Sequence, residues 1–276
     1  MNLYAISDLH LGHQTNYQAL ARLPFFPNDW LIVAGDIGET IAHFHYALRI
    51  LTERFQQVIW VPGNHDLWTL SSAEHPDRGQ AKYLRLVNLC RSYGVLTPED
   101  PYVYWPGADF KALLVPTMTL YDYSFLATSL SREAALARAI ANKVICADEL
   151  VLHTDPYANM EAWCAARCEY TEERLSALSP DMPLIIINHY PLHQDMALLP
   201  HIPDFRIWCG TQRTEDWTHR FPIKLIIHGH LHIRRSSIRN GVRYEEVSLG
   251  YPGQWDQSRA IAGHLRKITL SDCQDP

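Results

Sequence analysis

Short apolar runs that end in polar turns most strongly limit how this chain can fold. Runs rich in Val, Ile and Leu recur along the sequence, separated by segments with apolar residues at helical spacing, such as 41–55 and 81–93. Alternating buried strands and helices are typical of βαβ units in a largely parallel sheet. We therefore predict an α/β fold, with strands at 3–6, 31–34, 58–61, 112–115, 184–188, 225–227, 244–247 and 264–268.

One long segment interrupts this alternation. Residues 121–178 contain no glycine and include two helical stretches, at 131–151 and 157–178. A length of 276 residues suits one α/β domain with an insertion. We expect a single domain over 1–276 with a helical insertion or cap at about 121–180. Two roles for this segment are equally consistent with the sequence: helices that only cover the sheet, or a cap that faces the substrate.

The first polar turns place carboxylates and a histidine at predicted strand ends. Asp8 and His10 follow the first strand, and in an extended backbone residues two apart share one side. Asp36 follows Gly35 after the second strand, where its two oxygens can bridge two cations. Glu39 fits a helix-start acid, with a supporting contact to the site as the weaker alternative.

The third turn combines an amide, an imidazole and a carboxylate. Asn64 offers a neutral oxygen to a cation, and His65 can contact substrate as a general acid. Asp66 either orients His65 or caps the next helix. Since ligands gather at the carboxyl ends of parallel strands, we expect this turn to lie close to the turns that follow the first two strands.

Histidines occupy the remaining strand ends. His189 follows the run LIIIN. His230 and His232 follow Gly229, which permits close approach, and in an extended backbone these two histidines share one side. We expect His228 to be packed within the preceding strand. The seven candidate ligands offer nitrogen and oxygen without thiolate, a set that suits Mn, Fe, Zn or Co; they are Asp8, His10, Asp36, Asn64, His189, His230 and His232.

Composition limits the partners. The net charge is −6 and the pI about 6.2, which argues against a basic groove for long nucleic acid. We see neither a signal-peptide pattern nor an apolar run long enough to span a membrane, and therefore expect a cytoplasmic protein. The scattered cysteines, including the pair Cys164 and Cys168 as well as Cys273, are expected to be reduced and packed.

In their order, these motifs resemble the calcineurin-like metallophosphoesterase superfamily, whose pattern is D-x-H, G-D, G-N-H-D or G-N-H-E, H and G-H-x-H. Here they read DLH (8–10), GD (35–36), GNHD (63–66), His189 and GHLH (229–232). The resemblance implies a four-layer α/β/β/α sandwich with two central mixed sheets. It also implies a cofactor of two divalent metal ions, for which Mn²⁺, Fe²⁺ or Fe³⁺, Zn²⁺ and Co²⁺ are the candidates.

The resemblance also assigns roles to individual residues. Asp36 bridges the two ions, His65 is the catalytic histidine and Asp66 is its partner. The remaining ligands divide into two sets: Asp8, His10 and His232 for one ion, and Asn64, His189 and His230 for the other. Two cations clamp the phosphate and lower the pKa of a bridging water towards about 7, so that hydroxide attacks phosphorus.

We therefore expect a hydrolase that cleaves phosphate esters, most simply a phosphodiesterase acting on a small or nucleotide-like substrate. A phosphomonoesterase, a nuclease and a non-catalytic interaction scaffold are the alternatives. His13, Trp68 and His193 lie near ligands in the sequence and either line the pocket or are incidental loop residues. Aromatic residues of the insertion either stack on a base or pack in the core; they are Tyr121, Tyr123, Phe125 and Trp163. The loop SLGYPGQW (248–255) gives no firm role to Tyr251 or Gln254, and the oligomeric state is not readable.

Overall fold

Two mixed β-sheets form the centre of the structure, a computed structural model that describes residues 1–70, 77–125 and 130–270. In the first sheet, three neighbouring strands are parallel and a fourth lies antiparallel at the edge. Its spatial order is β10 (Arg266–Ile268), β1 (Leu3–Ile6), β2 (Phe26–Val33) and β3 (Phe55–Trp60).

The second sheet has a parallel centre with an antiparallel strand at each edge. Its order is β4 (Val103–Tyr104), β5 (Leu113–Pro116), β6 (Leu184–Ile187), β7 (Ile223–His228), β9 (Val242–Glu246) and β8 (Ser236–Arg239). All the predicted strands are present, whereas β4 and β8 were not predicted. Both are short strands at the edges of the sheet. Because their side chains are partly exposed, their sequences lack the apolar pattern from which the other strands were predicted.

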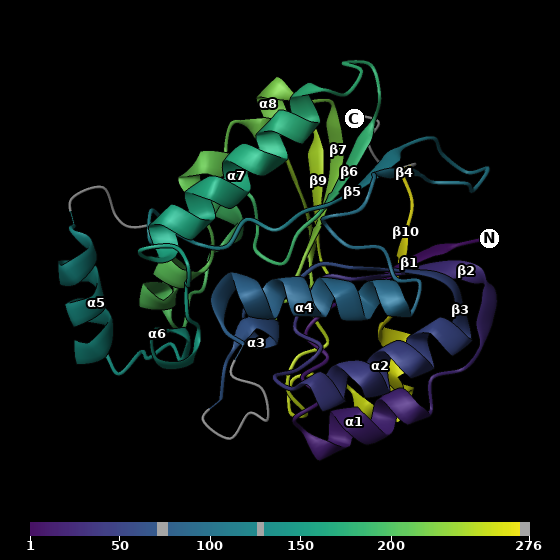
Figure 1. Cartoon of the computed structure of the whole chain (residues 1–276), viewed down its shortest axis with the longest axis horizontal. Coiled ribbons are helices and arrows are strands. Elements are labelled where there is room, and N and C mark those ends of the chain that lie inside the picture. The colour runs from purple at the N-terminus through teal and green to yellow at the C-terminus, as the bar shows by residue number, and fades with distance from the viewer. Residues whose placement is uncertain (71–76, 126–129, 271–276) are drawn as a thin grey trace.

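Helices flank the pair of sheets (Figure 1). On the side of the first sheet lie α1 (Gln14–Ala21), α2 (Ile41–Arg54) and α4 (Gly79–Ser92), and α7 (Met160–Ser176) and α8 (Trp217–Arg220) lie beside the second. This arrangement confirms the predicted α/β sandwich with two mixed sheets. Short 3-10 helices, none of them predicted, are η1 (Gln194–Met196), η2 (Pro203–Trp208), η3 (Gln212–Thr214), η4 (Gln257–Arg259) and η5 (Ile261–His264).

Alternate side chains of the central strands enter different parts of the core. In β2, Leu31 and Val33 pack in the cluster that includes the helices, whereas Ile32 packs between the two sheets. In β6, Ile186 and Ile187 divide in the same way. Burial on both faces explains why these strands are continuous apolar runs in the sequence, since neither face meets water.

The helical segment differs from its prediction in one respect. The expected helix over 131–151 is divided into α5 (Arg132–Ala141) and α6 (Asp148–Val151). α5 ends because Lys143 adopts a left-handed backbone, with φ of 60°, and the amide of Val144 bonds to the carbonyl of Ala139. This Schellman-type ending normally uses glycine, so a lysine at this position did not indicate it. No helix in the described part of the chain is long and apolar enough to cross a membrane.

Candidate metal centre

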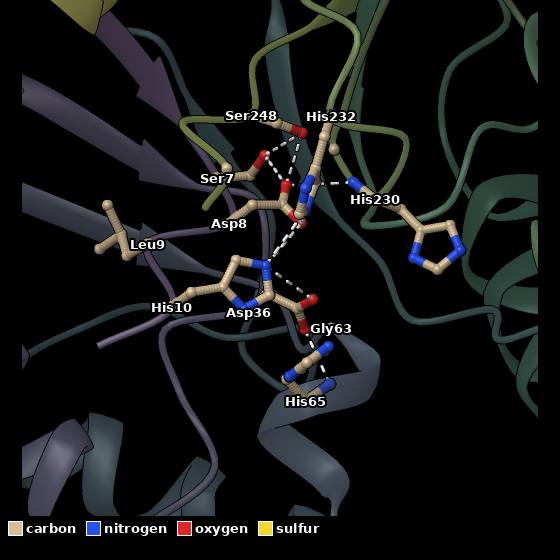
Figure 2. A network of polar contacts seen from close by, with 12 residues as sticks. Ser7, Asp8, Leu9, His10, Asp36, Gly63, His65, His230, His232 and Ser248 are labelled. Carbon is tan, nitrogen blue, oxygen red and sulfur yellow. Dashed lines mark hydrogen bonds and ion pairs between the residues drawn. The ribbon is translucent and has the colours of Figure 1, made fainter. Parts of the chain in front are cut away.

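The two sheets meet at the carboxyl ends of their central strands. Ser7, which follows β1, donates its amide to the carbonyl of Val247 at 3.1 Å and accepts from the amide of Leu249 at 2.8 Å. These bonds join the end of the first sheet to the end of β9 in the second. The polar turns after β1, β2, β3 and β7 therefore face one another across this junction (Figure 2).

Asp8, His10 and His232 form one group of converging donor atoms. Nε2 of His232 lies 3.1 Å from Oδ1 of Asp8, and Nε2 of His10 lies 3.1 Å from Nε2 of His232. Asp8 and His10 are almost fully buried. Two imidazole nitrogens that face each other beside a carboxylate are the arrangement expected of ligands directed at a common ion.

The second oxygen of Asp8 is held by the protein. Oδ2 accepts from Oγ of Ser7 at 2.5 Å, from Oγ of Ser248 at 2.7 Å and from the amide of His230 at 3.1 Å. Figure 2 shows these contacts on one side of the carboxylate. Because these three hydrogen bonds occupy Oδ2, the other carboxylate oxygen, Oδ1, faces the imidazoles of His10 and His232.

Asp36 lies between the two groups of histidines. Its Oδ2 is 3.9 Å from Nε2 of His10 and 3.4 Å from Nε2 of His189. Its Oδ1 accepts from the amide of His65 at 2.8 Å. A buried carboxylate that faces ligands on both sides is suited to a bridging position.

Asn64, His189 and His230 form the second group. Oδ1 of Asn64 lies 3.2 Å from Nε2 of His189 and 3.2 Å from Nδ1 of His230. Nδ1 of His189 donates to the carbonyl of Ala34 at 2.8 Å, so Nε2 is the ring nitrogen that faces the site. The same pattern of an outer hydrogen bond fixing the ring is common among histidines that bind metals.

Several of these residues adopt a left-handed backbone, which the sequence did not predict. The assumption of extended backbone at Asp8, His10, His230 and His232 was wrong: their φ angles are 54°, 43°, 73° and 54°, and that of Asp36 is 56°. Such conformations cost about 1–2 kcal/mol each for residues other than glycine. Their concentration at one junction indicates that the turns are shaped for side-chain placement, with strain offset by the surrounding fold.

Two glycines allow the turns to approach closely. A Cβ on Gly63 would lie 2.1 Å from Oδ1 of Asp36, and one on Gly229 would lie 2.3 Å from Oδ2 of Asp8. Both distances are shorter than any real carbon–oxygen contact. The prediction that glycine permits close approach at Gly229 is confirmed.

The electrostatics reflect the crowding of acids and imidazoles. Burial disfavours charge on every group, but the neighbouring histidines outweigh it and lower the pKa of Asp36. The same attraction, mainly to Asp36, raises the pKa of His189 to about 10 despite burial. Burial and the proximity of His189 lower the pKa of His230 to about 3. His230 is thus neutral, the form in which imidazole binds a cation.

The donor atoms fit a metal centre. Ligands at about 2.0–2.2 Å from one ion lie roughly 3 Å apart around it, and the donor pairs in both groups are separated by 3.1 or 3.2 Å. Carboxylate, amide and imidazole donors converge, and no cysteine is among the groups that could hold an ion in the described residues. The described cysteines are free and buried, as predicted; Cys273 lies outside the described residues.

His65 stands beside His10 and Asp36, with its ring centroid 4.5 Å from that of His10, and its partner is not the one that we predicted. Nδ1 of His65 lies 3.2 Å from Oε1 of Glu39. Asp66 instead accepts from the amides of Asp36 and Gly63, each at 3.0 Å. It thereby holds the two turns together and caps α3 (Asn64–Leu67), the alternative that the sequence left open.

The three candidate substrate contacts differ in position. The ring of Trp68 stacks on His65 with centroids 3.6 Å apart. His13 is exposed, and its ring lies 5.2 Å from that of Tyr251. The described contacts of His193 are with Asp195 and other residues outside the metal centre, so they give no support to a substrate role.

The loop 248–255, for which the sequence analysis found no firm role, contributes Gln254 and Tyr251 to this site. Oε1 of Gln254 accepts from Nδ1 of His232 at 2.7 Å and from the amide of Tyr251 at 2.7 Å. The ring of Tyr251 lies 4.6 Å from His10 and 4.9 Å from His232. The aromatic residues of the insertion, by contrast, pack in the core; Tyr121, Tyr123, Phe125 and Trp163 are all buried, and so is His228, as predicted.

Fold and site together define a phosphoesterase, and comparison with known families agrees. The sequence pattern of the calcineurin-like phosphoesterases matches residues 1–234. The chain belongs to this family. It is therefore a phosphoric ester hydrolase whose family and His/Asp clusters imply a metal site.

Among individual proteins, the chain is similar to one curated relative along nearly its whole length. It is 43% identical over 268 residues to the [acyl-carrier-protein] phosphodiesterase PptH of Mycobacterium tuberculosis, covering 96% of this chain and 82% of that protein. The crystal structure of phosphopantetheinyl hydrolase (PptH) from Mycobacterium tuberculosis superposes with a TM-score of 0.93 at 41% identity. That match covers 100% of this chain and 98% of the other.

Proposed function

We propose that this enzyme hydrolyses the phosphodiester that attaches a phosphopantetheinyl group to an acyl-carrier protein. The observation that carries the proposal is the similarity to PptH over the whole chain, at 41% identity and a TM-score of 0.93. The expectation of a small or nucleotide-like ester is thereby replaced by a diester held on a protein partner. The pantetheine arm remains the small-molecule part of that substrate.

The proposed reaction consumes one water. The oxygen of water forms a bond to phosphorus, and the bond between phosphorus and the serine oxygen of the carrier protein breaks. The serine oxygen takes up a proton. The products are the unmodified carrier protein and phosphopantetheine as a phosphomonoester.

We propose that the donor groups hold two divalent cations. Asp36 would lie between the ions, and the nitrogen and oxygen donors favour Mn²⁺, Fe²⁺ or Fe³⁺, Zn²⁺ or Co²⁺. When bound, such ions offset the phosphate charge and lower the pKa of water. The proposed ligands are Asp8, His10 and His232 for one ion, and Asn64, His189 and His230 for the other.

His65 is the proposed proton donor to the leaving serine oxygen. Burial disfavours the imidazolium, but the carboxylates of Asp36 and Glu39 outweigh it and raise the pKa of His65. The contact of Nδ1 with Glu39 leaves Nε2 as the atom able to hold the transferred proton. Trp68 covers one face of the ring and limits its rotation.

The other readings are less well supported. The net charge of −6 disfavours a nuclease that binds long nucleic acid. A non-catalytic scaffold does not require seven converging donors and a paired histidine. A cytoplasmic location stays a prediction that fits a carrier-protein substrate.

The test is direct hydrolysis of a holo acyl-carrier protein by the enzyme with added Mn²⁺. Intact-protein mass spectrometry should show loss of the phosphopantetheinyl group, and chromatography should show free phosphopantetheine. The His65→Ala variant is the control for contaminating activity. If bis-p-nitrophenyl phosphate is cleaved but holo carrier protein is not, the substrate assignment is wrong and the phosphodiesterase class stands.

A further inference from the structure

A carboxylate of the helical segment reaches the metal centre. Asp148 lies in α6, is 1% exposed, and is separated from Asn64 by 84 positions in the sequence. Its Oδ1 accepts from Nδ2 of Asn64 at 2.9 Å and from Nε1 of Trp68 at 2.6 Å. One oxygen therefore contacts both a proposed metal ligand and the ring that stacks on His65.

The contact with Asn64 selects one orientation of its side-chain amide. Oδ1 of Asp148 accepts both of its hydrogen bonds, from Nδ2 of Asn64 and from the indole of Trp68, so it faces the NH₂ group of Asn64 and not its oxygen. The oxygen of Asn64 is consequently turned to the opposite side, where it lies 3.2 Å from both His189 and His230. A flipped amide would present hydrogen atoms to a cation and would lose the contact with Asp148.

The contact with Trp68 holds the indole ring against His65. The indole donates to Asp148, and its ring lies at 29° to the imidazole with centroids 3.6 Å apart. The backbone carbonyl of Trp68 in turn accepts from the buried ammonium group of Lys82. With both ends held, the indole cannot turn away from His65 without breaking a buried hydrogen bond.

α6 is itself anchored on both sides. The amide of Thr69 donates to the carbonyl of Val151 at 2.8 Å, which fastens α6 to the chain that follows Trp68. Oε1 of Glu149 accepts from Tyr123 at 2.8 Å and from Trp208 at 2.7 Å. α6 is thus a rigid support for Asp148.

We infer that Asp148 is a positioning residue that holds the oxygen of Asn64 towards the metal site and Trp68 against His65. The inference rests on the proposed role of Asn64 as a ligand. It makes the helical segment a structural part of the catalytic centre, in keeping with the proposed single domain over 1–276. The segment is then more than a cover for the sheet.

The decisive measurement is metal affinity, which needs no substrate. Metal-free Asp148→Ala should bind Mn²⁺ in calorimetric titration about 10–100-fold more weakly at one of two sites, the usual effect of losing a group that supports a ligand. Asp148→Asn keeps an acceptor oxygen and should recover most of the affinity. Equal affinity of Asp148→Ala and the wild type at both sites would overturn the inference.

Glu172 provides the matched control. It also accepts from an indole, that of Trp217 at 2.9 Å, but it lies on α7 and pairs with Arg220. Glu172→Ala should leave Mn²⁺ affinity unchanged, and a loss equal to that of Asp148→Ala would assign the effect to general destabilisation. The Trp68→Phe variant loses the hydrogen bond to Asp148 but leaves the contact between Asp148 and Asn64 in place. It should therefore keep Mn²⁺ affinity and lower kcat, because the ring beside His65 is no longer held by Asp148.

Two further measurements separate the ways in which the inference can fail. Unchanged affinity in Asn64→Ala would refute the ligand role of Asn64, and with it the premise, whatever Asp148 does. In the wild-type protein, the side-chain NH₂ of Asn64 should exchange with solvent much more slowly than that of the exposed Asn240. Equal exchange rates would refute the contact with Asp148 even if Asp148→Ala did not fold.

Discussion

Glu39 lies between two imidazoles, with Oε1 3.2 Å from Nδ1 of His65 and Oε2 3.4 Å from Nδ1 of His43. Burial disfavours the charge of Glu39, but its hydrogen bonds with the two histidines outweigh burial and lower its pKa. The same contact is among the causes that raise the pKa of His65. Glu39 and His65 therefore stabilise each other in their charged forms.

Replacement of Glu39 by Gln should impair proton donation without emptying the metal centre. We expect kcat to fall by part of the roughly 10²–10⁴-fold that a general acid contributes, because the ring loses its charged partner. Turnover and bound metal should be measured on the same sample. Glu53→Gln, which alters an exposed pair on α2, is the control and should behave as wild type.

His65→Ala should retain both metal ions and lose most turnover on esters with poor leaving groups. An ester with p-nitrophenolate as leaving group needs little proton donation, so its hydrolysis should suffer less. The ratio of the two rates is the readout. An equal loss on both esters would argue that His65 does not donate the proton.

The metal-centre residues and the main strands could be predicted because each lies in a strong local pattern. Asp8, Asp36 and His189 follow runs that are buried on both faces, and such runs are recognisable in the sequence alone. Because the carboxyl ends of parallel strands lie at one edge of a sheet, these side chains are then expected to meet. Their left-handed backbone was not predicted, since φ at a turn depends on the contacts around it.

The supporting contacts could not be predicted for a different reason. Asp148 meets Asn64 across 84 positions, and Gln254 meets His232 from a loop of no regular structure. Nothing in the local sequence of either residue distinguishes it from a surface polar group. The resemblance paired Asp66 with His65, whereas the fold places Glu39 beside His65 and Asp66 caps α3, the alternative that the residues had left open.

Asp36→Ala should be more damaging than the loss of any outer ligand. Asp36 faces His10 on one side and His189 on the other, so its removal disturbs both groups. We expect metal analysis to show fewer than two ions per chain and activity to be lost. Retention of two tightly bound ions would contradict the bridging position.

Gln254→Ala should weaken metal binding through His232. The amide oxygen of Gln254 fixes the proton of His232 on Nδ1 and leaves Nε2 facing Asp8. Loss of such an outer partner typically lowers metal affinity or activity by about 10–100-fold. Gln257→Ala removes an exposed contact in the same region and should leave Mn²⁺ affinity unchanged, which makes it the matched control.

Away from the metal centre, Glu99 ties α4 to α7 and should make stability depend on acid. Its Oε1 accepts from Tyr83 at 2.6 Å and pairs with Arg167 at 2.7 Å; Tyr83 and Arg167 are buried, and Glu99 is partly buried. Burial alone would raise the pKa of Glu99, but Arg167 and the hydrogen bond from Tyr83 outweigh it and lower the pKa below 4.5.

A folded-state pKa below the unfolded value means that the contribution is fully present above pH 4.5 and is lost as the pH falls through the folded pKa. Glu99→Gln should therefore lower the free energy of unfolding at pH 7 by about 1.5–3 kcal/mol, the range for hydrogen bonds to charged groups. Denaturant titrations between pH 7 and pH 3 should show the difference from wild type shrinking only below pH 4.5. A difference that stays constant down to pH 3 would mean that the charge of Glu99 is not what stabilises the contact between α4 and α7.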